Sequence, residues 1–228
     1  MKLVGIFSFK SLLGAAVISL IATPAMAIVA SLNPTADGDI QLFGGTDIDT
    51  TDTIIAFTQS GGLIRNAIFE FDLSSIPDGS AINSVSLDMT LTRFVSNVSS
   101  NPAAIDIFAF AGDGSILEAD FSTAGTQLFD GTTPFGGVAG DVRSFALSPT
   151  SFFDGALAAD LITIRIETDS FASINIAALE NSTFDPVTLN INFEPADPVP
   201  APAFASLFAG GLAVMGMFGW RRKRLDAA

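Results

Sequence analysis

The chain has 228 residues, a formal net charge of −14 and no cysteine, histidine or tyrosine. Without cysteine it forms no disulfides. Without histidine it has no Ser-His-Asp or Cys-His catalytic centre and no histidine-ligated zinc site. Because acidic residues outnumber basic residues by 24 to 10, nucleic acid is not an expected partner.

Residues 1–27 have the three parts of a secretory signal peptide. Two lysines supply the positive charge, an apolar run follows over 12–21, and Ala25 and Ala27 form an Ala-x-Ala site with cleavage after Ala27. The apolar run is shorter than the roughly 18 residues of a membrane anchor. We therefore expect export through the Sec translocon and removal by signal peptidase, with an uncleaved N-terminal anchor as the alternative.

Residues 28–196 are predicted to form one β-domain. In 84–92 every odd residue is apolar and every even residue is polar, which is typical of a half-buried strand. In 161–167 the even residues are apolar, so these are expected to face inward. The other predicted strands are 53–57, 66–73, 104–110, 142–147, 171–177 and 187–194.

Turn residues separate these segments, and helical periodicity is almost missing. Only 149–159 favours a short helix, with Ser148 as its cap. Many strands joined by turns predict an all-β fold, an antiparallel β-sandwich of jelly-roll type, flanked by the signal peptide and one C-terminal transmembrane helix. The 21 phenylalanines are expected to fill the space between two sheets.

The acidic residues near the start suggest one candidate metal site. Alternate carboxylates in a Gly/Thr-rich stretch, interpreted as a loop, would place several oxygens within reach of Ca²⁺, which takes six to eight oxygen ligands. Solvated loop carboxylates are the alternative interpretation. The candidate ligands are Asp37, Asp39, Asp47, Asp49 and Asp52.

The segment from residue 65 to residue 82 contains an arginine, Phe71-Asp72-Leu73-Ser74, a turn and an isoleucine, and a long strand follows. Near the end, Ala178-Leu179-Glu180-Asn181 precedes a proline and the last strand. This layout resembles the DNRLRE-type domains. The resemblance implies a jelly-roll module of surface proteins, some of which bind acidic or neutral polysaccharide. If its first and last parts lie side by side, Arg65 would form a structural pair with Glu180.

The C-terminal segments have the layout of a membrane-sorting tail. A proline-rich stretch at 197–202 precedes 18 uncharged residues at 203–220, which are just enough for a transmembrane helix. The tail at 221–228 is expected to stay in the cytoplasm because of its basic cluster. An ordinary tail anchor is the alternative. The stop-transfer cluster consists of Arg221, Arg222, Lys223 and Arg224.

This arrangement resembles the PEP-CTERM sorting signal of Gram-negative bacteria, through the motif Val199-Pro200-Ala201-Pro202-Ala203. Ala201 stands where that family commonly has glutamate. The resemblance implies an exosortase-type peptidase as a partner. It also implies transient anchoring in the inner membrane before delivery to the cell surface or the extracellular space.

Together these features predict an exported structural or adhesive protein of the cell surface or of a biofilm matrix. A calcium-dependent carbohydrate-binding module is the first alternative. A polysaccharide hydrolase is the second, because a carboxylate pair is the acid–base chemistry that this composition leaves. Nothing in the sequence selects such a pair, so we expect no enzyme.

Overall fold

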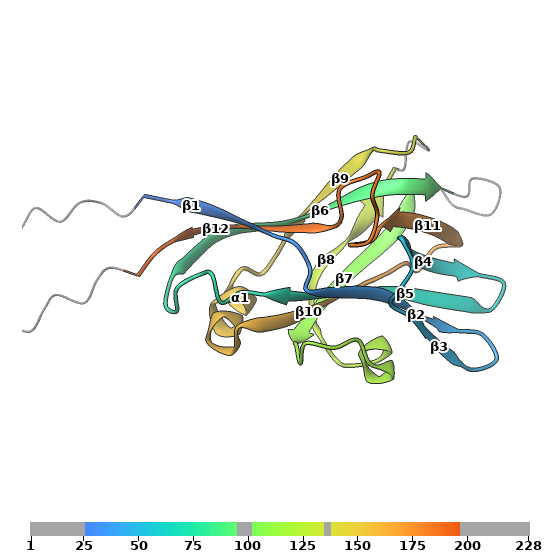
Figure 1. Ribbon diagram of the computed structural model, residues 1–228, viewed down its shortest axis with the longest axis horizontal. Coiled ribbons are helices and arrows are strands. Elements are labelled where there is room, and N and C mark those ends of the chain that lie inside the picture. Colours follow the sequence, from blue (N-terminus) through green and yellow to red (C-terminus); the bar gives the residue numbers. More distant parts are fainter. Residues whose placement is uncertain (1–25, 95–101, 135–137, 197–228) are drawn as a thin grey trace, which may run out of the picture.

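The computed structural model describes residues 26–94, 102–134 and 138–196, and in them 12 strands form one sheet with antiparallel pairing (Figure 1). Helical structure is limited to α1 (Ser151–Ala156) and the 3-10 turns η1 (Glu118–Phe121) and η2 (Leu157–Ala159). The strands are β1 (Ile28–Leu32), β2 (Ala36–Leu42), β3 (Thr46–Asp49), β4 (Ile54–Ser60), β5 (Leu63–Asp72), β6 (Ala81–Phe94), β7 (Ala103–Ala111), β8 (Thr126–Thr133), β9 (Val142–Leu147), β10 (Leu161–Glu167), β11 (Ala172–Ala177) and β12 (Thr188–Glu194).

The sheet is curled around its own core. Its strand order is β1-β12-β6-β11-β4-β5-β10-β7-β8. Three strands lie off this path: β2 pairs with β5, β3 pairs with β2, and β9 pairs with β6. One buried cluster joins side chains of β6 and β12, such as Leu87 and Leu189, to side chains of β5 and β10, such as Phe69 and Ile164. The two halves of the sheet therefore face each other across a single core, and the all-β prediction is confirmed.

The strands with clear alternation were predicted well. Val85, Leu87, Met89 and Leu91 are buried along β6, as their spacing predicts. The structure adds β1, β2, β3 and β8, which the sequence pattern did not indicate. The predicted helical stretch begins two residues later than expected, with Thr150 and not Ser148 at the N-cap position, and α1 and η2 together end at Ala159 as predicted.

The core depends on aromatic side chains, as expected from the phenylalanine content. Phe57, Phe69, Phe71 and Phe153 are among the largest fully buried side chains of the described residues. Burial of each contributes roughly 1.5–3 kcal/mol. The rings of Phe129 and Phe145 meet edge to face at 5.0 Å between centroids, which locks β8 against β9.

Gly38 lets β2 and β3 approach closely. A methyl group at this position would overlap the carbonyl oxygen of Asp49 and lie 3.0 Å from the Thr50 side chain. We expect Gly38→Ala to lower the free energy of unfolding by about 1–3 kcal/mol, since the clash is with backbone that must shift. Urea denaturation measures this loss. Gly155→Ala is the control, because open space surrounds that glycine and alanine favours a helix.

The two ends of the described chain lie side by side. Ile28 at the start of β1 is the direct partner of Phe193 near the end of β12. Figure 1 shows both ends leaving the molecule together, on the side opposite the β2–β3 hairpin. The signal peptide cleavage residue Ala25, the sorting motif and the basic cluster lie outside the described residues, whereas Ala27 lies just before β1. In the described ranges, no helix is long and apolar enough to span a membrane.

Candidate functional site

The acidic residues near the start of the body lie mainly on strands and not in a loop. Asp37 and Asp39 belong to β2, and Asp47 and Asp49 belong to β3. Asp39 is paired directly with Asp49 in this hairpin, and Asp52 follows β3. The prediction of a loop is therefore wrong: these four aspartates occupy alternate positions on two paired strands and share one face of the hairpin.

The two buried aspartates of β2 have partners within the protein. An Asp37 carboxylate oxygen accepts a hydrogen bond from the Leu179 amide at 2.7 Å. Asp39 accepts one from the Ala56 amide at 3.0 Å. Burial raises the pKa of each carboxyl to about 6. Within the described ranges no group of three or more acidic side chains could hold a metal ion, so the calcium site predicted at these aspartates is not formed.

Arg65 pairs with β2 and not with Glu180. Its Nε lies 3.4 Å from an Asp39 carboxylate oxygen, and its guanidinium donates a hydrogen bond to Gln41. Glu180 lies instead near Asp37, whose pKa its charge helps to raise. The predicted pair is wrong because the register of β2 against β5 places Gln41 opposite Arg65.

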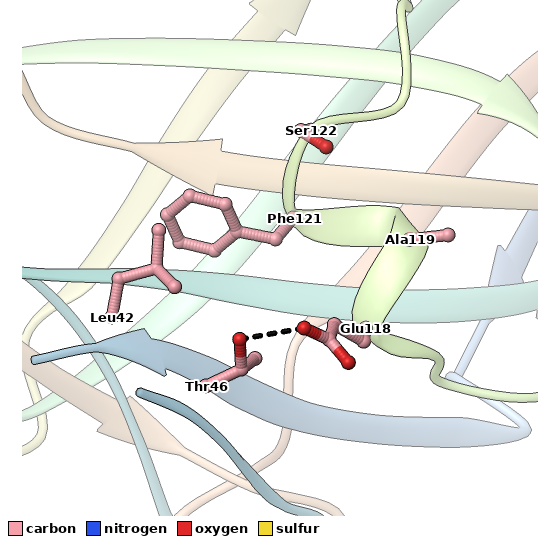
Figure 2. Close-up of a pocket in the computed structure, with 6 residues that line it drawn as sticks. All are labelled: Leu42, Thr46, Glu118, Ala119, Phe121 and Ser122. Atoms are coloured by element: carbon pink, nitrogen blue, oxygen red, sulfur yellow. Dashed lines mark hydrogen bonds between the residues drawn. The ribbon is translucent and has the colours of Figure 1, made fainter. Parts of the chain in front are cut away.

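A pocket of about 340 Å³ opens between the β2–β3 hairpin and η1 (Figure 2). Leu42 and Phe121 supply apolar surface, while the Thr46 hydroxyl donates a hydrogen bond to Glu118 at 2.6 Å. This volume is at the lower end of the range for small-molecule sites. The lining residues are Leu42, Thr46, Glu118, Ala119, Phe121 and Ser122.

The wall of the pocket that carries Glu118 and Phe121 belongs to the covering segment, residues 112–125, which lies over the outer face of β5, β10 and β7. Arg165 of β10 holds this segment from below. Its Nη1 donates hydrogen bonds to the carbonyl oxygens of Asp120 at 2.9 Å and Thr123 at 2.8 Å. Its guanidinium also stacks on the ring of Phe108, 5.1 Å from the centroid. The side chain is buried, although strand alternation predicts an outward, solvated position.

A buried carboxylate holds the start of the covering segment. Glu70 of β5 accepts a hydrogen bond from the Thr163 hydroxyl, and it accepts a second from the Gly114 amide at 3.3 Å. Burial raises the pKa of this carboxyl. Gly112 passes so close to Glu70 that a Cβ there would overlap the carboxylate. The covering segment is therefore fixed at both ends by β5 and β10.

A second acidic cluster lies where β7 meets the end of β10. Asp106 accepts a hydrogen bond from the Gln127 amide group at 3.0 Å and lies beside Asp169. Burial, with the Asp169 carboxylate as the next cause, raises the pKa of Asp106 to about 6. Burial also raises the pKa of nearby Glu167. The carboxylates of this cluster repel one another when they are ionised, and they do not line the pocket.

The pocket itself presents one carboxylate. Of the six lining residues in the described part of the chain, Glu118 alone is acidic. Hydrolysis of a glycosidic bond by the usual mechanism uses two carboxyl groups that flank the bond. Sequence reasoning did not find the pocket, because its residues come from two segments 72 positions apart.

The chain was also compared with known proteins. No family model matches it, and no curated protein matches it.

Proposed function

We propose that the protein is exported and acts as a structural or adhesive protein of the cell surface or extracellular matrix of a Gram-negative bacterium. Its body would be a jelly-roll sandwich, delivered by the signal peptide at 1–27 and by a PEP-CTERM-type signal with a transmembrane helix at 203–220. The antiparallel sheet curled around one core supports the sandwich. The order of cleavage site, body, proline motif, apolar run and basic cluster supports the export route.

The pairing of Ile28 with Phe193 is the observation that carries this proposal. It means that 1–27 and 197–228 join the body at the same end. A membrane-held intermediate would therefore keep that end at the membrane, and the end with the β2–β3 hairpin would point away from it. A body attached at one end leaves its opposite end free to contact the matrix.

The free end carries exposed apolar side chains that suit a contact surface. Phe43 is 65% exposed in the β2–β3 turn, and Phe171 is 51% exposed just before β11. Ile64, 40% exposed, is the direct partner of Leu42 next to that turn.

Mass spectrometry of protein recovered from cells and medium tests the export route. We expect the parent protein to begin at Ile28 and to lack the apolar run and the basic cluster. Replacement of 221–224 by neutral residues, or of Pro200 and Pro202 by alanine, should leave the C-terminal segment attached and the protein misplaced. Asp78→Asn, an exposed change in the body, is the control. An unchanged mature mass in both sorting variants contradicts the proposal.

The pocket favours a second function beside the first, the binding of carbohydrate without calcium. It joins an apolar ring, a carboxylate and hydroxyl groups at one opening. This combination suits a ligand that has both hydroxyl groups and apolar C–H faces.

A further inference from the structure

We infer that the pocket between the β2–β3 hairpin and η1 binds a neutral saccharide segment, with Phe121 as its stacking surface and Glu118 as its hydrogen-bond acceptor. This inference deepens the proposed adhesive function and rests on it. It names the class of ligand that the exported body would hold.

The apolar part of the pocket is formed by two half-buried side chains. Leu42 at the end of β2 and Phe121 at the end of η1 both line the opening, and Figure 2 shows them on the same side of it. A half-buried aromatic ring that water can reach is a suitable surface for the C–H face of a sugar ring. Leu42 adds apolar surface beside this ring.

The polar part is suited to hydroxyl donors. The Thr46 hydroxyl donates a hydrogen bond to Oε1 of Glu118 at 2.6 Å, which orients the carboxylate. A ligand hydroxyl that donates to this carboxylate would form one of the stronger kinds of hydrogen bond, because the acceptor is charged. The hydroxyl groups of Thr46 and Ser122 add donors and acceptors on either side.

The charges around the pocket favour a neutral ligand over an anionic one. None of the six lining residues is basic. Arg165 lies beneath the covering segment, where it is 7% exposed and bonded to the carbonyl oxygens of Asp120 and Thr123. An acidic polysaccharide would therefore meet the Glu118 carboxylate with no cation to offset the repulsion.

The wall that carries Glu118 and Phe121 is held in one position before any ligand arrives. Besides the two hydrogen bonds from Arg165, the Asn66 side-chain amide donates to the carbonyl oxygen of Phe121 at 3.4 Å. A site fixed in advance loses less conformational freedom on binding. A 3-10 turn of only four residues can therefore serve as a wall of the binding site.

Calorimetric titration tests the inference with protein purified from the producing cells, in the form that mass spectrometry finds there. The probes are neutral hexasaccharides of β-1,4-glucan, β-1,3-glucan and β-1,4-linked N-acetylglucosamine, with polygalacturonate as the anionic probe. We expect at least one neutral hexasaccharide to bind and polygalacturonate not to bind. Phe121→Ala and Glu118→Gln should each weaken binding about tenfold or more.

Matched controls lie close to the pocket. Leu117→Ala removes an apolar side chain that is 46% exposed next to Glu118 but does not line the pocket. Glu180→Gln removes an exposed carboxylate elsewhere. Both variants should bind like the parent protein. Raising the salt concentration should change the affinity little, since the ligand carries no charge.

Failure to bind any neutral hexasaccharide overturns the inference, as does equal binding by the parent protein, Phe121→Ala and Glu118→Gln. Tighter binding of polygalacturonate than of the neutral probes also overturns it. Failure of the export proposal is read separately, from the processing and location of the protein. If the protein is exported and processed as expected but binds no saccharide, only this inference is contradicted. If it binds a neutral saccharide but is not exported, the proposed export and surface role are contradicted.

Discussion

Replacing Arg165 with glutamine is expected to lower the free energy of unfolding by about 3–5 kcal/mol. The guanidinium is buried and donates two hydrogen bonds to carbonyl oxygens of the covering segment. It also lies 3.8 Å from the Glu167 carboxylate. Glutamine would leave at least one of these carbonyl oxygens without its hydrogen bond and the Glu167 carboxylate without its positive partner. Burial limits how far water can replace these interactions.

Arg143→Gln is the matched control for this change. Arg143 pairs with Asp141 at 3.2 Å, but both side chains are about one-third exposed. Exposed pairs of this kind contribute about 0–1 kcal/mol. Guanidinium chloride denaturation of the two variants gives the comparison. Equal losses would show that Arg165 does not hold the covering segment. The same Arg165→Gln variant should weaken saccharide binding as well, because η1 loses its support.

Stability is expected to rise as the pH falls from about 7 towards 4, the opposite of ordinary acid denaturation. The pKa of Asp37, Asp39 and Asp106 is raised to about 6 in the folded protein, mainly by burial. The ordinary value is 3.8, so between about pH 4 and pH 6 the folded state binds more protons than the unfolded state. The free energy of unfolding therefore falls as the pH rises through this window.

The expected gain on acidification is about 3 kcal/mol or more across the three groups. Below about pH 4 the trend reverses, because hydrogen bonds hold the pKa of Asp49 and Asp72 below the ordinary value. Those carboxylates lose their stabilising contacts when protonated. Thermal unfolding at a series of pH values should show a maximum in this acidic range.

The double variant Asp37→Asn, Asp106→Asn tests which residues cause the effect. Asparagine can still accept the hydrogen bonds from the Leu179 amide and the Gln127 side chain, but it does not titrate. The pH dependence should become clearly weaker but not vanish, because Asp39 still titrates with a raised pKa. Asp78→Asn, at an exposed turn, should leave it unchanged. A parent protein that is more stable at neutral pH than at pH 5 would contradict the expectation.

Clean alternation of apolar and polar residues was enough to predict β6 and β12 from the sequence. It failed for β2 and β3, because aspartate is depleted in strands and four aspartates in 37–49 favour a loop. The structure accommodates two of them inside by giving the carboxylates of Asp37 and Asp39 backbone amide partners. Those partners come from distant segments, so no local pattern indicates them.

The binding pocket and its support were also beyond sequence reasoning. In β10 the apolar even residues predict one buried face, yet Thr163 and Arg165 on the other face are buried as well. They are buried because the covering segment packs over them, and its sequence contains no strong periodic signal. Arg65 shows the same limit: its partner depends on strand register, which pairs Gln41 and Arg65 directly.

The adjacency of Ile28 and Phe193 also makes the body a candidate for circular permutation. Directly paired residues of antiparallel strands lie about 5 Å apart, so a short linker could join the two ends. The chain could then be reopened in the β4–β5 turn, where Gly61 and Gly62 have φ values of 58° and 89° and no close neighbours. Neighbouring ends and exposed glycine turns are the features that favour such rearrangements. The permuted protein would keep its strand pairs but carry new ends beside the β2–β3 hairpin.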